Sequence, residues 1–142
     1  MSLVDIRPGF RAFLLEDPTI AGIVGQRIYD SQFPQGELRT GIVFTEVSSI
    51  GDHHMEGPSG LAQARYQVDA WASIQDDASD LSLAIKSRLD GFRGSFVWGD
   101  QSPQFSVLVR GVFFQTARAT YDETSKLFNK GADYIIVFGE RL

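Results

Sequence analysis

The chain of 142 residues is 43% hydrophobic and 12% aromatic, which suits one folded domain spanning residues 1–142 and excludes a disordered chain. Its formal net charge of −5, with Lys and Arg scattered, excludes the basic patch that nucleic-acid binding needs, and its lack of cysteine excludes disulfides and thiolate metal sites. Because no apolar run approaches the roughly 18 residues of a membrane span and the N-terminus has no signal-peptide pattern, we expect a soluble protein of the cytosol.

Two helices are predicted at the start of the chain. Asp5 is placed to cap the first helix, which has Pro8 in its first turn, where a missing N–H is harmless. The apolar face of this helix consists of residues at helical spacing: Ile6, Phe10, Phe13 and Leu14. Asp17-Pro18 has the form of an N-cap and a first-turn proline, so it begins a second, short helix that ends at Gly25. Residues 27–29 then form a short extended segment.

Two strands are predicted next, separated by a loop. From Gly41 to about Ile50 the apolar residues follow a period of two, which is typical of a strand. The polar, glycine-rich stretch Gly51–Gly60 has no periodicity and is predicted to be a mobile loop. Leu61–Trp71 shows the clearest alternation in the chain and is predicted to be the second strand.

The second half of the chain is predicted to contain one helix and three strands. Ser73-Ile-Gln-Asp76 has the form of a capping box and begins a helix that ends at Gly91. Strands follow at 95–98, at 105 to about 120, and at 131–140. Short connections between neighbouring strands favour antiparallel pairing. The predicted fold class is α+β, with a mostly antiparallel sheet of four to five strands packed against two main helices.

Apolar residues are predicted on both faces of this sheet. In the long strand, strict alternation puts Val107, Val109 and Phe113 on one side, and the opposite side receives Leu108, Val112 and Phe114. Two helices cover only one face, so we expect copies or partners to cover the other; the alternative is that loops or the N-terminal helices cover it. The interface candidates come from the 51–60 loop and from large apolar side chains on the strands: His53, His54, Met55, Glu56, Trp71, Trp98, Val112, Phe113 and Phe114.

No catalytic, cofactor or metal site is predicted. His53, His54 and Glu56 could ligate a metal, but adjacent side chains in one loop converge poorly on an ion. The Gly57–Gly60 segment lacks the last glycine of a nucleophile elbow. Asp69 lies on the polar side of its strand, and the acids near the third helix start match its dipole.

The chain resembles the tail-completion proteins of long-tailed phages, a family long catalogued as a domain of unknown function. Three segments carry the resemblance: DPTIAGIVGQRIYDSQFPQG from Asp17 to Gly36, RYQVDAWASIQDDASDLSLAIKSRLDGFRG from Arg65 to Gly94, and ADYIIVFGE near the C-terminus. Their order and spacing cover nearly the whole chain, although none of them is a catalytic motif.

The resemblance implies a structural subunit of a phage or prophage tail, assembled in the bacterial cytoplasm. It implies a homo-oligomeric ring, expected to be a hexamer, at the head-proximal end of the tail, with the major tail tube protein and the head connector or stopper protein as partners. DNA would pass through the lumen without specific binding, which an acidic protein suits. The alternatives are another head–tail connector component, such as a stopper, or a small ligand-binding module or hydrolase that uses the 51–60 loop as a lid.

Overall fold

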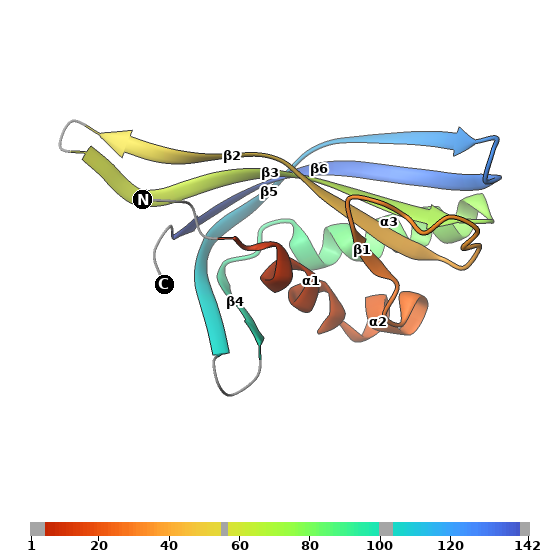
Figure 1. Ribbon diagram of the computed structural model, residues 1–142, viewed down its shortest axis with the longest axis horizontal. Coiled ribbons are helices and arrows are strands. Elements are labelled where there is room, and N and C mark those ends of the chain that lie inside the picture. The colour runs from red at the N-terminus through yellow and green to blue at the C-terminus, as the bar shows by residue number, and fades with distance from the viewer. Residues whose placement is uncertain (1–4, 55–56, 100–103, 140–142) are drawn as a thin grey trace.

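The computed structural model describes residues 5–54, 57–99 and 104–139, with the backbone alone for 51–54 and 57–60. Its sheet has the strand order β1-β2-β3-β6-β5-β4 (Figure 1). The strands are β1 (Ile28–Asp30), β2 (Gly41–His54), β3 (Gly57–Ala72), β4 (Gly94–Gly99), β5 (Gln104–Asp122) and β6 (Leu127–Gly139). The helices are α1 (Arg7–Leu15), α2 (Pro18–Val24) and α3 (Gln75–Leu89).

The sheet has more strands than the four to five predicted. The predicted extended segment at 27–29 joins it as β1, which pairs in parallel with β2 from Ile42 to Phe44, whereas the other pairs are antiparallel. A three-residue strand is too short for alternation to reveal it, and only its neighbour β2 gives it partners for its backbone groups.

The predicted 51–60 loop is wrong over most of its length, because β2 and β3 form one long hairpin. Their pairing continues to His53 opposite Pro58 and His54 opposite Gly57. Register shifts after Glu46 and after Gly51 break the alternation on which the sequence prediction depended. The candidates His53 and His54 therefore lie at the end of β2, and the candidates Met55 and Glu56 lie outside the described residues.

Helix α2 begins and ends as predicted, whereas α1 and α3 are capped differently. Asp17 accepts hydrogen bonds from the N–H groups of Thr19 and Ile20, at 2.8 and 3.3 Å, and Gly25 ends α2 with a φ of 60°. The N-cap position of α1 is Ile6, and Asp5, one residue earlier, accepts from the Arg7 N–H at 3.1 Å.

The capping box predicted at Ser73–Asp76 does not form. The N-cap residue of α3 is Ile74, and no side chain caps that end. The helix itself is confirmed, with Ala78, Leu81, Ile85 and Leu89 buried. Burial of this apolar stripe, rather than a terminal hydrogen bond, therefore holds α3 in place.

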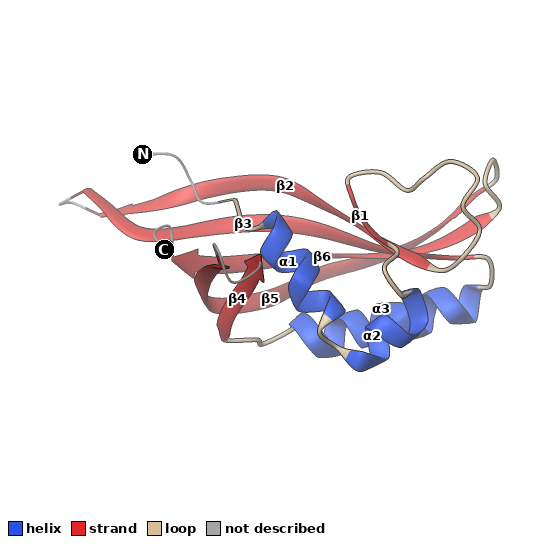
Figure 2. Cartoon of the chain, turned by 60° about the horizontal axis from the view of Figure 1, so that its bottom comes forward, coloured by secondary structure: helices blue, strands red, loops and turns tan. Residues whose placement is uncertain are grey.

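All three helices lie on one face of the sheet, here called the helix face (Figure 2). Phe10 of α1 lies at the centre of the core beneath them, with its ring centroid 4.7 Å from Tyr66 and 5.3 Å from Phe44. Phe10 and Tyr66 are fully buried. One set of alternating side chains on the strands therefore points into an aromatic core. The opposite face of the sheet, here called the bare face, has no helix on it.

A β-bulge changes the predicted sides of β5. The register shifts between Val109 and Gly111, so that Arg110 is the extra residue. Beyond it, Val112 points to the same side as Val109, and both are buried in the core. Phe113 therefore shares the bare face with Leu108, and the prediction that put Val112 and Phe114 beside Leu108 is wrong.

Candidate assembly surfaces

The bare face consists of three zones along the strands, and a loop covers the first. Residues 31–40 cross this end of the face, on the side opposite the helices (Figure 2). Phe33 of this loop stacks on Trp71 with 6.1 Å between ring centroids, and Leu127 beneath is only 1% exposed. An open groove of about 610 Å³ lies between the loop and the β5–β6 turn, with Trp71 and Asp122 in its lining. The interface candidate Trp71 is thus half covered by its own chain.

A charged network occupies the middle zone. Arg118 of β5 donates to Asp133 of β6 at 3.1 Å, and its other terminal nitrogen lies 3.6 Å from the carboxylate of Asp69 on β3. Arg65 donates to the second oxygen of Asp133 at 3.0 Å. The Arg118 side chain crosses β6 at Gly131, where a Cβ would overlap the Asp69 carboxylate. The network ties three strands together and requires a glycine at its centre.

Asp69 is the most buried member of this network, at 6% exposure. Burial raises the pKa of its carboxyl, and the hydrogen bond donated by Gln67 opposes part of that rise. The prediction placed Asp69 on the polar side of its strand, which the structure confirms. Its partners are side chains of the same sheet, so its role in this structure is to join strands.

The third zone is apolar and uncovered, and we call it the bare-face patch. It contains side chains from four strands, β2, β4, β5 and β6: Ile50, Val97, Leu108, Phe113, Ile135 and Val137. Phe113 lies opposite Ile135, and Val137 lies opposite Gly111, over which the Phe113 ring folds. Phe113 is 50% exposed and Leu108 is 48% exposed. Several exposed apolar side chains of this size on one face are uncommon on a monomer and mark interaction sites.

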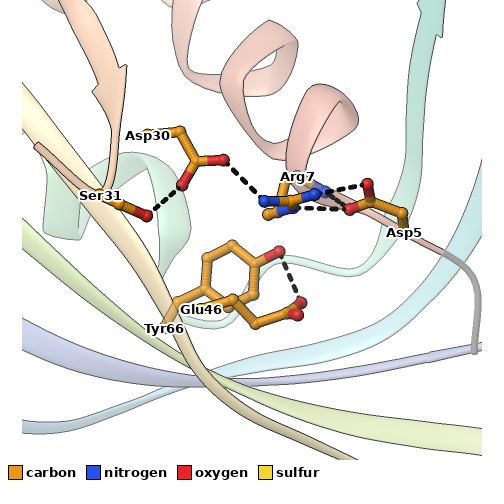
Figure 3. A network of polar contacts seen from close by, with 6 residues as sticks. All are labelled: Asp5, Arg7, Asp30, Ser31, Glu46 and Tyr66. Carbon is orange, nitrogen blue, oxygen red and sulfur yellow. Dashed lines mark hydrogen bonds and ion pairs between the residues drawn. The ribbon is translucent and has the colours of Figure 1, made fainter.

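Another polar network joins α1 to the edge of the sheet (Figure 3). Arg7 pairs with Asp5 at 3.0 Å and with Asp30, the last residue of β1, at 3.1 Å. The buried Tyr66 hydroxyl donates to Glu46 at 3.0 Å, and burial raises the pKa of Tyr66 far above its usual value. The ion pairs anchor the N-terminus of α1, and a phenol held protonated in this way is unsuited to act as a base or nucleophile.

The remaining interface candidates fall in different surroundings. Trp98 packs against the core, stacks on Phe105 with 5.7 Å between ring centroids, and lies so close to Gly9 that a Cβ there would come within 2.5 Å of its ring. Phe114 is half-buried on the helix face, with the Lys86 ammonium 4.2 Å from the centre of its ring. With Val112 in the core, Phe113 is the β5 candidate that lies in the bare-face patch.

Five members of the bare-face patch are not among the interface residues predicted from the sequence: Ile50, Val97, Leu108, Ile135 and Val137. Of these, Leu108 was predicted only to be an apolar residue on a strand with two apolar sides. The signal that could have placed this residue is Arg110-Gly111, because a glycine that interrupts a strand pattern often marks a bulge. With the shift applied, alternation puts Leu108 and Phe113 on one face.

Within the described ranges, no three ligating side chains gather where they could hold a metal ion. The same part of the chain contains no helix with the length and hydrophobicity of a membrane span.

The comparisons with known proteins agree with this architecture. A chain in a solved virion of a native gene transfer agent particle has a similar fold, with a TM-score of 0.67, 16% sequence identity and 90% coverage of both chains. No curated protein matches the chain. The family model for tail completion protein gp17 matches residues 9–138, which include every helix but the first two residues of α1 and nearly the whole sheet. The chain therefore belongs to the tail completion protein gp17 family, a family of structural proteins of the phage tail.

Proposed function

We propose that this tail protein forms a ring, expected to be a hexamer, at the head-proximal end of the tail, where it completes the tail tube and joins it to the head connector. The observation that carries the proposal is the bare-face patch, on the face that no helix covers. Phe113 and Leu108 are half exposed there, and each large apolar side chain left in water costs roughly 1.5–3 kcal/mol relative to burial. Contact with other tail subunits would recover this free energy.

A closed ring requires a heterologous contact, in which one surface of a subunit meets a different surface of its neighbour. The elongated shape suits such a contact, because the β2–β3 hairpin lies at one end of the molecule and the 31–40 loop at the other (Figure 1). The major tail tube protein and the head connector or stopper protein are the proposed partners at the two faces of the ring.

The proposed role of the acidic charge is to keep DNA from sticking in the lumen. The formal net charge is −5 for each subunit, so six copies would bring about −30 to the ring. Repulsion of the phosphate backbone would let DNA pass without specific binding.

We propose a structural and not a catalytic role. Asp5, Asp69 and Asp133 lie beside arginines, and the Tyr66 hydroxyl is buried and bonded to Glu46. Substitution of both His53 and His54 by Ala tests the hydrolase or metal-site alternative. Assembly should remain unchanged and metal analysis should find no bound ion; a stoichiometric metal that is lost in the double variant would contradict the structural role.

The principal test is a charge placed in the bare-face patch. Phe113→Asp should abolish incorporation into tails and lower the assembled mass, while the melting temperature of the monomer stays within a few degrees, because half of this side chain is already in water. Leu83→Asp, at a 64% exposed position on α3, is the matched control and should assemble normally. Equal losses of monomer stability and assembly in Phe113→Asp would contradict the proposal.

Particles that lack the protein distinguish completion from other connector roles. Electron micrographs should show tails of uncontrolled length, or finished tails that cannot join heads. Filled heads that leak DNA beside normal, joinable tails would instead indicate a stopper.

A further inference from the structure

Among the described residues, two long stretches of strand have no neighbouring strand on one side. β1 pairs with β2 only from Ile42 to Phe44, so in the described part of the chain no strand flanks residues 45–54 on that side. At the opposite edge, β4 pairs with β5 only up to Val109. Beyond Val109, the residues that follow α3 occupy this edge of β5. The N–H of Gly91 donates to the Val112 carbonyl at 2.8 Å, and the Asp90 side chain accepts from the Phe114 N–H at 3.1 Å. No described strand flanks residues 115–122 beyond it.

The backbone groups that point out of these edges follow from the hydrogen bonds already formed. On β2, Ile42 donates to Arg27, and Phe44 accepts from Ser31, both on the side away from β3. Every second residue faces the same way, with one shift at the bulge after Glu46.

Applied to both strands, this alternation identifies the residues with outward-facing N–H and C=O groups. On β2 they are Glu46, Ser49 and Gly51. On β5, beyond the bulge at Gln115, they are Ala117, Ala119 and Tyr121. Each edge thus offers a ladder of backbone donors and acceptors to an incoming strand.

The strand directions make the two edges complementary. The four central strands, in the order β2-β3-β6-β5, alternate in direction, so β2 and β5 run in opposite directions. In a ring that keeps the strands of neighbouring copies aligned, the β5 edge of one copy meets the β2 edge of the next in antiparallel orientation. Each free stretch is the C-terminal part of its strand, so the two stretches lie at opposite ends of the sheet. Neighbouring copies that pair through them are therefore staggered, and in a closed ring this stagger tilts the strands relative to the ring axis.

Each edge has a β-bulge, but neither carries proline or lysine. Residues 45–54 and 115–122 contain no proline and no lysine, the residues with which proteins protect open edges. Three exposed large side chains lie along them instead: Val47 at 54%, Ile50 at 62% and Tyr121 at 47%. A pairing strand would cover these side chains together with the backbone.

From these observations, and resting on the proposed ring, we infer that neighbouring subunits join by β-sheet addition, with residues 45–54 of one copy paired antiparallel to residues 115–122 of the next. A continuous sheet then runs around the ring, with the helices on one side and the bare face on the other.

Disulfide cross-linking tests this pairing directly, because the chain has no cysteine of its own. Four residues of the two free stretches have side chains on the bare face and backbone N–H and C=O groups directed into their own sheet: Ser48, Ile50, Thr116 and Thr120. In the proposed pairing, residues of this kind lie opposite one another as non-hydrogen-bonded pairs, with Cα atoms about 4.5 Å apart. Three double variants sample successive registers: Ser48→Cys with Thr120→Cys, Ser48→Cys with Thr116→Cys, and Ile50→Cys with Thr116→Cys. Within one copy these positions are separated by β3 and β6, about 14 Å apart, too far for a disulfide.

At least one pair should give a ladder of cross-linked oligomers up to the size of the ring on oxidation. Ser48→Cys with Ser87→Cys, where Ser87 is exposed on α3, is the matched control and should give none. A ring of normal mass in which none of the three pairs cross-links would overturn the edge pairing and leave the proposed ring intact. Absence of any ring or assembled tail with the unmodified protein would overturn both.

A proline on the free edge gives an independent result. Ala119→Pro removes an N–H that points away from β6, so the monomer should keep its circular dichroism spectrum and melt cooperatively, while ring formation falls at least tenfold. Ala119→Val keeps the N–H and should assemble normally. Equal assembly of the two variants would overturn the pairing.

Discussion

The two faces of the sheet are built from the same strands but differ in how far they are buried. On the helix face, Phe10 sits among aromatic rings at 0% exposure, whereas on the bare face Phe113 is 50% exposed. The helix face is covered within one chain, because side chains of α1 and α3 pack against it. The bare face has a loop at one end, ion pairs in the middle and open apolar surface at the other end. Most of the packing that stabilises the fold therefore lies on the helix face, and the open apolar part of the bare face is available for assembly.

The largest expected effect comes from the same truncation made on each face. Phe10→Ala should lower the free energy of unfolding by about 3–5 kcal/mol, because it leaves a cavity between Tyr66 and Phe44. Phe113→Ala should cost about 1 kcal/mol or less, since half of the ring is already solvated. Urea denaturation of both variants measures this contrast, and similar losses would mean that the bare face contributes to the core.

A smaller effect should arise at the ion-pair network of the bare face. Gly131→Ala should destabilise the fold by about 1–3 kcal/mol, because its Cβ would overlap the Asp69 carboxylate and displace Arg118. Gly22→Ala in α2, where a Cβ has nothing within 4 Å, is the matched control and should stabilise by about 0.5–1 kcal/mol through helix propensity. Thermal melts that show no loss for Gly131→Ala would mean that the network does not hold the strands together.

The smallest effect is a pH dependence that originates at Asp69. Because burial raises its pKa, the native state binds this proton more tightly than the unfolded state. The resulting stabilisation is fully present below the unfolded pKa, near 4, and is lost as the pH rises through the folded pKa. The free energy of unfolding of the unmodified protein, relative to Asp69→Asn, should therefore increase as the pH is lowered from 7 toward about 4. A constant or opposite difference would show that Arg118 compensates fully for burial.

The helices, most of the strand positions and the family could be predicted from patterns in the chain. Local signals suffice for these, as when Asp17 caps α2 with two backbone hydrogen bonds, or when alternation in β3 separates buried Tyr66 and Val68 from the outer row. The order of elements and the segments that resemble tail-completion proteins are likewise properties of the chain alone. The match of the family model over residues 9–138 confirms that interpretation.

Which apolar residues remain uncovered depends on the tertiary structure. The bulge at Arg110 reverses the sides of the residues up to the next bulge at Gln115, so Val112 enters the core and Phe113 leaves it. Gly111 is a local hint of the first shift, but the alternation of apolar residues does not reveal it. β1 and the continuation of the β2–β3 hairpin through a glycine-rich stretch also depend on partners distant in sequence. Strand pairing joins residues that are distant in sequence. The free edges and apolar patches available for assembly can therefore be identified only once the pairing of all the strands is known.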